Sequence, residues 1–245
     1  VTGTNGKTST VQMLEHCLKY FKKTAGQVKV AGNVGYAMLD SLVDMKKEDI
    51  IILELSSFQL YWLDSHNLLR ERTYGAITSF AQDHLDWHKD SQQYKNAKQK
   101  IMTLCQQTFC PSQINAAFPA AIGVDTKANS NQMHPVISLN TPIVSALLQS
   151  YDTTLKADEI KKALQSFKPD YARVDFLSKP HYLVINDAKA TNIFASLSLL
   201  EQQTWLGKTL WYLGGQMKGQ ELNILEKFNE FQNIDFAIFG PQIHA

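Results

Sequence analysis

Three observations in the 245-residue sequence predict an α/β protein with a mostly parallel sheet. Short apolar runs that suit buried strands alternate with amphipathic stretches of helical period. A glycine-rich, P-loop-type motif at residues 2–8 stands directly before the first predicted helix. The alternation restarts after Pro169, so we expect one domain over residues 1–169 and a second over residues 170–245.

In the first domain, the predicted elements are those of a sheet covered by helices. Continuous apolar runs typical of buried parallel strands occupy Asp49–Leu55 and Tyr74–Phe80. Amphipathic periodicity predicts helices over Thr8–Lys22, Gln92–Leu104 and Leu155–Phe167.

In the second domain, strands are predicted at His181–Asn186, Thr209–Leu213 and Asp235–Phe239, with a helix over Asn192–Gln202. No helical pattern follows the last strand. We therefore expect this α/β domain to be incomplete.

Bulk properties exclude several classes of function. Lys plus Arg is 24 and Asp plus Glu is 23, and this balance argues against general nucleic-acid binding. No apolar run reaches the roughly 18 residues that a membrane span needs. The cysteines Cys17, Cys105 and Cys110 have no paired or metal-binding spacing, which favours free thiols in a reducing compartment. Because no signal-peptide pattern opens the chain at Val1, we expect a cytoplasmic protein.

The motif TGTNGKT, Thr2–Thr8, indicates a phosphate-binding loop. Glycines allow backbone N–H groups to converge on phosphate oxygens, and the N-terminus of the following helix adds positive charge. Lys7 would reach the terminal phosphates, and the Thr8 hydroxyl would bind Mg²⁺. The strict P-loop pattern requires glycine where Val1 stands, so this is a shortened variant. The alternative is an ordinary glycine-rich turn before a helix.

Three further positions are candidates that spacing alone leaves open. Glu54 closes an apolar run, where a strand-end carboxylate suits Mg²⁺ or simply faces solvent. His84, in the sequence DHLD, suits a metal or a reacting oxygen, but a loop histidine is more often structural. Lys98 shares its predicted helix with Lys95 and Lys100, which is typical of a solvated basic face.

Several motifs in order resemble those of the Mur ligase family. They are TGTNGKT at Thr2–Thr8, ELSSFQ at Glu54–Gln59, DHLD at Asp83–Asp86, NDAKATN at Asn186–Asn192 and LGGQMKG at Leu213–Gly219. ELSSFQ and NDAKATN are similar to those of the D-glutamate-adding member. The resemblance implies a central ATPase domain over residues 1–169 and an incomplete Rossmann-like domain over residues 170–245. The family's N-terminal UDP-binding domain is expected to be absent.

The resemblance also implies an activity in peptidoglycan precursor synthesis. ATP would phosphorylate the terminal carboxylate of UDP-N-acetylmuramoyl-L-alanine, and the amine of D-glutamate would displace phosphate from the acyl phosphate. The implied cofactors are ATP and two Mg²⁺ ions. The expected partners are these small molecules alone, with no nucleic acid and no membrane, and the expected state is a monomer.

Residue roles follow from the resemblance, position by position. Lys7, His84 and Lys98 would be catalytic. Nucleotide contacts are expected from Gly3, Thr4, Asn5, Gly6, Lys7, Thr8, Thr10, Arg173 and Asp187. Expected metal ligands are Thr8, Glu54, His84 and Lys98, the last as a carbamate. Expected substrate contacts are Asn33, Ser57, Lys189, Thr191 and Lys218.

The sequence also departs from the family pattern. The interdomain motif HRxE reads Ala172-Arg173-Val174-Asp175, and the adenine-contacting HNxxN motif is missing before the helical stretch Pro142–Leu148. One explanation is a segment missing between Asn140 and Thr141. The alternative is a non-catalytic nucleotide-binding module that has lost adenine recognition. A folylpolyglutamate synthase-like ligase is the other alternative, since that class shares the loop and the fold.

Overall fold

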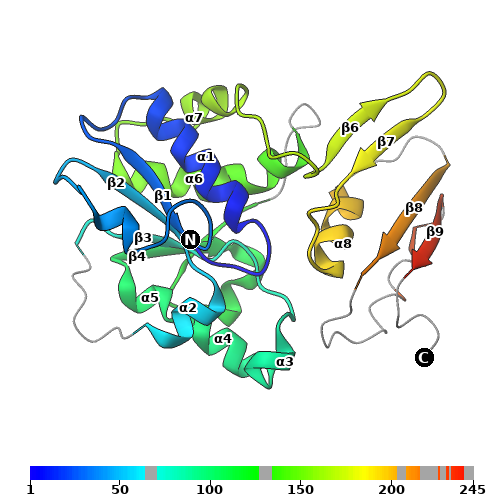
Figure 1. Ribbon diagram of the computed structural model, residues 1–245, viewed down its shortest axis with the longest axis horizontal. Helices are drawn as coiled ribbons and strands as arrows, with labels where there is room; N and C mark the ends of the chain where they lie inside the picture. Colours follow the sequence, from blue (N-terminus) through cyan, green and yellow to red (C-terminus); the bar gives the residue numbers. More distant parts are fainter. Residues whose placement is uncertain are drawn as a thin grey trace.

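The computed structural model describes residues 1–63, 71–126, 134–202, 208–215, 226, 230–231 and 233–239. Its first part is a parallel sheet between two layers of helices, and its second part is a smaller α/β unit (Figure 1). Among the described residues, no helix combines the length and the apolar character that crossing a bilayer requires.

Five parallel strands form the sheet of the first part: β1 (Val28–Gly32), β2 (Ile50–Glu54), β3 (Tyr74–Ala76), β4 (Gln107–Pro111) and β5 (Ile122–Val124). Strand β1 pairs with β2, and β3, β4 and β5 pair in that order.

Val1 and Thr2 connect these two groups of strands. The nitrogen of Val1 donates to the carbonyl of Leu53 at 2.7 Å, and the amide of Thr2 donates to the carbonyl of Ala76 at 2.8 Å. The glycine-rich loop therefore begins in the middle of the sheet, between the carboxyl ends of β2 and β3, which is the edge where parallel sheets bind ligands.

Helices cover both faces of this sheet. One layer contains α1 (Lys7–Tyr20), α6 (Pro135–Tyr151) and α7 (Ala157–Leu164); the other contains α2 (Ser57–Trp62), α3 (Leu85–His88), α4 (Ser91–Gln99) and α5 (Ile101–Leu104) (Figure 1). Short 3-10 turns occupy Asp40–Leu42 and Ser112–Ala117.

Adjacent strand residues face opposite layers. Ala76 and Phe109 pack with α1, α6 and α7, whereas Ile77 and Cys110 pack with α2 and α5. This alternation is the period of two that a strand imposes on its side chains. Both faces of the sheet are consequently buried, as the continuous apolar runs predict.

The second part contains β6 (Asp175–Ser178), β7 (Leu183–Asn186), α8 (Ile193–Gln202), β8 (Thr209–Gly214) and β9 (Ile234–Phe239). Strands β8 and β9 are parallel, but β6 and β7 pair antiparallel. Residues of α8 pack against both β8 and β9. The prediction of a mostly parallel protein is therefore confirmed, with β6–β7 as its exception.

The predictions for three elements were wrong in their extent: β3, the helix over Gln92–Leu104, and α6. Strand β3 ends at Ala76 rather than Phe80, because Thr78 and Ser79 instead hydrogen-bond the glycine-rich loop. The helix predicted over Gln92–Leu104 is divided into α4 and α5 at Lys100.

Helix α6 is longer than predicted and includes both Asn140 and Thr141. Pro142 lies inside this helix and cannot donate a backbone hydrogen bond. The side chains of Asn140 and Thr141 donate to the carbonyls of Val136 and Ile137, both at 2.7 Å.

Candidate active site

The glycine-rich loop leads into the N-terminus of α1. Gly3 and Gly6 have φ angles of +150° and +84°, and a Cβ at Gly3 would lie 2.1 Å from Thr78 Oγ1. Both positions therefore need glycine. Within the described chain, no side chain caps α1, and no acidic residue lies in its first turn. The first-turn amides of a helix lack intrahelical partners, so this end is suited to bind an anion.

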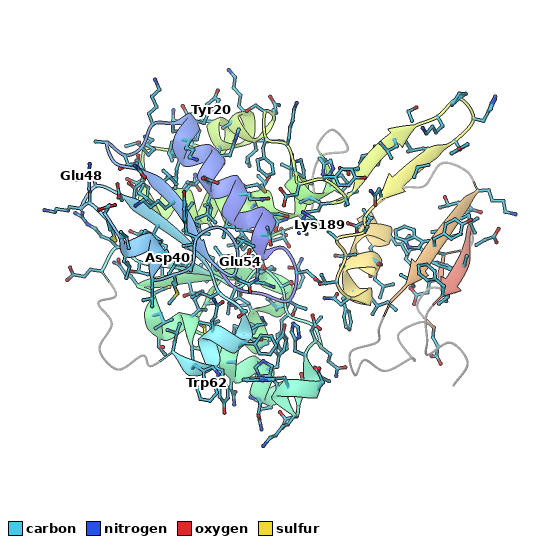
Figure 2. All side chains as sticks on the ribbon, in the orientation of Figure 1. Tyr20, Asp40, Glu48, Glu54, Trp62 and Lys189 are labelled. Atoms are coloured by element: carbon cyan, nitrogen blue, oxygen red, sulfur yellow. The ribbon has the colours of Figure 1, made fainter. Side chains whose placement is uncertain are left out.

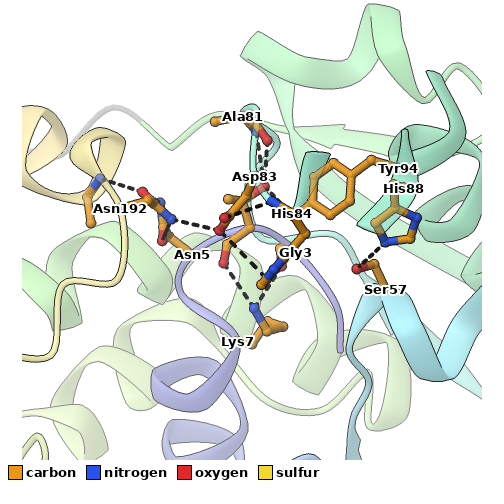
Figure 3. A network of polar contacts seen from close by, with 12 residues as sticks. Gly3, Asn5, Lys7, Ser57, Ala81, Asp83, His84, His88, Tyr94 and Asn192 are labelled. Carbon is orange, nitrogen blue, oxygen red and sulfur yellow. Dashed lines mark hydrogen bonds and ion pairs between the residues drawn. The ribbon is translucent and has the colours of Figure 1, made fainter. Parts of the chain in front are cut away.

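Two lysines converge on this loop. Lys7 Nζ donates to the carbonyls of Gly3 and Thr4, both at 2.9 Å (Figure 3). Lys98 Nζ donates to the same Gly3 carbonyl at 2.9 Å. Lys98 is 1% exposed. Burial lowers the pKa of Lys98 well below its usual range, and the charge of Lys7 lowers it further. Burial also lowers the pKa of Lys7, while the charges of Glu54 and Asp83 raise it.

Glu54, at the end of β2, is 1% exposed and lies in the centre of the first part (Figure 2). Its Oε1 accepts from Asn33 Nδ2 at 2.9 Å, and Oε2 has no hydrogen-bond partner among the described residues. Burying such an oxygen is costly in free energy unless a hydrogen-bond donor or a cation pairs with it. The unpartnered oxygen therefore fits a role in binding Mg²⁺, as does Thr8 in the first turn of α1.

Asp83 links the DHLD motif to the second part of the chain. Its Oδ1 accepts from the His84 amide at 3.0 Å, and its Oδ2 accepts from Asn192 Nδ2 at 3.2 Å. The side chains of Asn192 and Asn5 also exchange two hydrogen bonds, at 2.9 and 3.1 Å (Figure 3). The start of α8 is thus joined to the phosphate loop and to the residue preceding His84.

His84 has a φ of +54°, in the left-handed region, and stands at the start of α3. Its ring contacts Phe58 edge-to-face, with centroids 4.9 Å apart, and its Nε2 lies 3.8 Å from Asp83 Oδ2. Among the described residues, no three His, Cys, Asp or Glu side chains gather around one metal position.

Ser57 and His88 form a buried pair. His88 Nε2 lies 2.9 Å from Ser57 Oγ, and the two residues are 1% and 3% exposed respectively. Phe58 stacks on the His88 ring at 5.5 Å, and Trp87 meets it edge-to-face at 4.5 Å. The Ser57 hydroxyl is therefore held on the α3 side and closed to solvent.

In the second part, Asp187 and Lys189 follow β7. Burial raises the pKa of Asp187 to about 6, although a backbone hydrogen bond from Val174 and the charge of Arg173 oppose the shift. Lys189 Nζ lies 3.1 Å from Asp170 Oδ2. The other carboxylate oxygen of Asp170, Oδ1, accepts from Gln12 Nε2 of α1 at 3.0 Å.

The expected nucleotide and substrate residues fall into different environments. Thr10 is fully buried and donates to Asn140 Oδ1 at 3.1 Å, so its side chain packs against α6. The Nε of Arg173 is buried without a hydrogen-bond partner among the described residues. Thr191 lies at the surface before α8. Lys218 lies outside the described residues.

The structure brings Lys7, Lys98, Glu54 and the DHLD segment to one edge of the sheet. Sequence reasoning did not assign roles to Asp83, Tyr94, Asn192 or His88, which join these residues. Tyr94 had a recognisable signal, because it precedes Lys98 by four positions and so shares its helix face. The Asn5–Asn192 contact joins residues 187 positions apart, and nothing in either local pattern indicates it.

Comparison with known proteins points in one direction. A sequence model described as the Mur ligase middle domain matches residues 1–176. The UDP-N-acetylmuramoylalanine–D-glutamate ligase of Streptomyces avermitilis is 27% identical over 273 residues, covering 92% of this chain and 56% of that protein. The enzyme of the same name from Mycobacterium tuberculosis is 30% identical over 257 residues, covering 91% and 49%. The chain thus spans about half the length of the curated relatives it matches.

Solved structures show the same fold at lower identity. A MurF ligase from Thermotoga maritima, determined in complex with ADP, superposes with a TM-score of 0.73 at 16% identity, covering 98% of this chain and 66% of that one. The UDP-N-acetylmuramate–alanine ligase MurC of the same organism gives 0.59 at 18% identity, covering 97% and 66%. These similarities support the fold alone.

Proposed function

We propose a ligase function on one established premise: this chain belongs to the Mur ligase family. The proposed reaction joins D-glutamate to UDP-N-acetylmuramoyl-L-alanine at the expense of ATP, and it rests on the relatives of that name. The observation that carries the chemistry is the convergence of Lys7 and Lys98 on the Gly3 carbonyl, beside the buried carboxylate of Glu54.

For nucleotide binding, we propose that residues 1–169 act as a P-loop-type ATPase domain. The open N-terminus of α1 and the loop amides would bind the phosphates, and Lys7 would leave the carbonyls of Gly3 and Thr4 to pair with the terminal phosphates. Residues 170–245 would form a Rossmann-like domain that presents Arg173 and Asp187 to the nucleotide. Asn192 already joins that domain to the loop.

Glu54, Thr8 and His84 are the residues proposed to hold two Mg²⁺ ions. Mg²⁺ keeps several waters and takes its remaining ligands from phosphates, so one or two protein oxygens for each ion suffice. The ions would supply neutralisation of phosphate charge during phosphoryl transfer.

Lys98 is proposed to become carbamylated. Its lowered pKa increases the fraction of uncharged amine, and only that form adds CO₂, with release of one proton. The resulting carbamate would replace a buried cation with an anion and would relieve the repulsion from Lys7.

The proposed reaction has two chemical steps, and the protein holds the substrates in position for each. A free carboxylate has no adequate leaving group, so its oxygen attacks the γ-phosphorus of ATP and ADP departs. The amine of D-glutamate then adds to the acyl carbon, and phosphate leaves with that same oxygen. Lys189 and Thr191 are proposed to bind D-glutamate, whose two carboxylates suit cationic and hydroxyl partners. Asn33 is proposed to act on the side of the muramoyl substrate, and the buried Ser57 to act there indirectly, through the position of α2.

The substrates are small molecules, and we place the reaction in the cytoplasm with the protein acting as a monomer. Phosphate release tests the proposal: it should require ATP, the nucleotide-linked muramoyl-alanine and D-glutamate together. Stimulation by L-lysine or diaminopimelate instead would indicate another Mur ligase, and stimulation by a folate with glutamate would indicate a folylpolyglutamate synthase. ATP binding without turnover would indicate a non-catalytic module. Undiminished ligation by Lys7→Ala would reject the assigned catalytic site.

A further inference from the structure

Tyr94 of α4 touches two parts of the candidate active site that come from different elements. Its hydroxyl lies 3.1 Å from Thr4 Oγ1 in the phosphate loop, and its ring lies under Lys98 Nζ, 4.5 Å from the centroid. The tyrosine is 1% exposed. Figure 3 shows its ring in the network, between His88 and the loop.

The direction of the Tyr94–Thr4 hydrogen bond follows from the other partners of Thr4. Thr4 Oγ1 also lies 3.1 Å from the Ala81 carbonyl oxygen, which can only accept, so the single hydroxyl hydrogen of Thr4 goes to that oxygen. The Ala81 amide donates to the same Oγ1 at 3.1 Å. Tyr94 must therefore be the donor.

The ring of Tyr94 makes the second contact. A cation over an aromatic face is attracted by the electrons of the ring, and the attraction grows when water is excluded. Lys98 is buried, and it donates a hydrogen bond to Gly3, the neighbour of Thr4. The ring itself is fixed by Phe80, which stacks on it at 5.8 Å, and by His88, which meets it edge-to-face at 5.2 Å.

We propose that Tyr94 is a positioning residue that fixes the phosphate loop through its hydroxyl and Lys98 through its ring face. The hydroxyl of Tyr94 thus affects nucleotide binding, which depends on the position of the loop. Its ring affects the chemical step, which depends on the position of Lys98. Burial raises the pKa of Tyr94 above its ordinary value, which keeps the hydroxyl protonated as a donor.

Two substitutions separate the two contacts. Tyr94→Phe keeps the ring under Lys98 and removes only the hydrogen bond to Thr4, whereas Tyr94→Leu removes both. Tyr20→Phe is the matched control, since Tyr20 is 52% exposed on α1. The kinetic part of the test rests on the proposed function.

For Tyr94→Phe, the KM for ATP should rise about 2- to 10-fold, the effect of one lost hydrogen bond, while kcat stays within about 2-fold of wild type. Tyr94→Leu should in addition lower kcat by about 3- to 30-fold, because the Lys98 side chain loses the ring that holds it in position. Equal kcat losses in the two variants would overturn the proposal.

Amide hydrogen exchange in the ligand-free protein tests the loop contact without activity. Thr4 and Asn5 donate their backbone amides to the carbonyl and hydroxyl of Ser79. These amides should exchange about 2- to 10-fold faster in Tyr94→Phe, with no change in Tyr20→Phe. Thr4→Val should show at least this effect, because it also removes both contacts with Ala81. Adding Tyr94→Phe to Thr4→Val should increase the exchange no further. Unchanged exchange in Tyr94→Phe would overturn the proposal. If wild type had no ligase activity but Tyr94→Phe showed the faster exchange, only the proposed function would be refuted.

Discussion

Lys7 and Lys98 donate to one acceptor, the Gly3 carbonyl oxygen, each at 2.9 Å. Two ammonium groups at a single carbonyl repel each other, and that of Lys98 is held away from bulk water. Burial is the main cause of the lowered pKa of each lysine, and the charge of Lys7 contributes to the shift of Lys98. An anionic ligand that pairs with Lys7 would relieve this repulsion.

Lys98→Met tests the cost of this arrangement. The Met side chain fills the same space without a charge, and Gly3 keeps its hydrogen bond from Lys7. We expect the free energy of unfolding at pH 7 to rise by about 1–4 kcal/mol, as when buried charges are replaced by apolar groups, while ligase activity is lost.

The gain from Lys98→Met should depend on pH. A cation whose pKa is lowered on folding binds its proton more weakly in the folded state, so wild-type stability rises as the pH rises toward the unfolded value of 10.5. The difference between the variant and wild type should therefore shrink from pH 7 to pH 10 in urea titrations. Lys95→Met, on the same helix, is the control. A variant less stable than wild type at pH 7 would contradict this explanation.

Asn192→Asp tests the contact between the second part of the chain and the phosphate loop. An aspartate cannot donate to Asp83 Oδ2, and it places a second carboxylate beside a residue that is 3% exposed. The unfolding free energy at pH 7 should fall by about 1–3 kcal/mol. Repulsion raises a carboxyl pKa on folding, so stability is regained as the pH falls below that raised value. Asn96→Asp, at an exposed site on α4, should have little effect; equal losses in both variants would refute the role of Asn192.

His88→Phe tests the buried Ser57–His88 pair. Phenylalanine preserves the stacking on Phe58 but leaves the Ser57 hydroxyl without its partner in a buried site, which should cost about 1–3 kcal/mol of stability. Adding Ser57→Ala should recover part of that loss, because the unpaired hydroxyl is then gone. Denaturation of the single and double variants measures the coupling. Strictly additive losses would show that the two side chains do not depend on each other.

Asp187 and Asp152 should affect the pH dependence of the unfolding free energy in opposite directions. Burial raises the pKa of Asp187 to about 6, so its contribution is favourable at low pH and is lost as the pH rises from about 4 to above 6. Hydrogen bonds from Lys23 and Thr154 lower the pKa of Asp152 to about 2, so its contribution is present above about 4 and lost toward pH 2.

Asp187→Asn should consequently gain stability relative to wild type between pH 4 and pH 7. Asp152→Asn should lose stability at neutral pH and approach wild type near pH 2. Guanidinium titrations across this range measure both differences. A pH-independent difference for Asp187→Asn would show that this carboxyl group has an ordinary pKa in the folded protein.

The sequence predicts the regular parts of the fold well, because apolar periodicity reports burial directly. Helix α1, strand β2 and the strands and helix of the second part lie within a few residues of their predicted bounds. Strand β3 differs because its continuation makes long-range hydrogen bonds to the glycine-rich loop. The pairing of Lys189 with Asp170 likewise depends on tertiary contacts. Local patterns contain no information about such partners.

For the candidate site, motifs located the phosphate loop and Glu54, and the structure shows what spacing left open. Lys98 could not be separated from Lys95 and Lys100 by periodicity, yet it is the one of the three that is buried. Its burial depends on how α4 packs against the loop, through Tyr94 and Thr4. The basic-face interpretation of this helix is therefore wrong for Lys98.

Transfer of ¹⁸O tests the central claim, carboxylate activation by ATP, most directly. The muramoyl-alanine substrate would carry ¹⁸O in its terminal carboxylate, and the released phosphate would be analysed by mass spectrometry after reaction with ATP and D-glutamate. If an acyl phosphate forms, each turnover transfers one carboxylate oxygen to phosphate, so we predict one ¹⁸O atom per phosphate released. Phosphate free of ¹⁸O, in a reaction that still forms the amide, would contradict the mechanism.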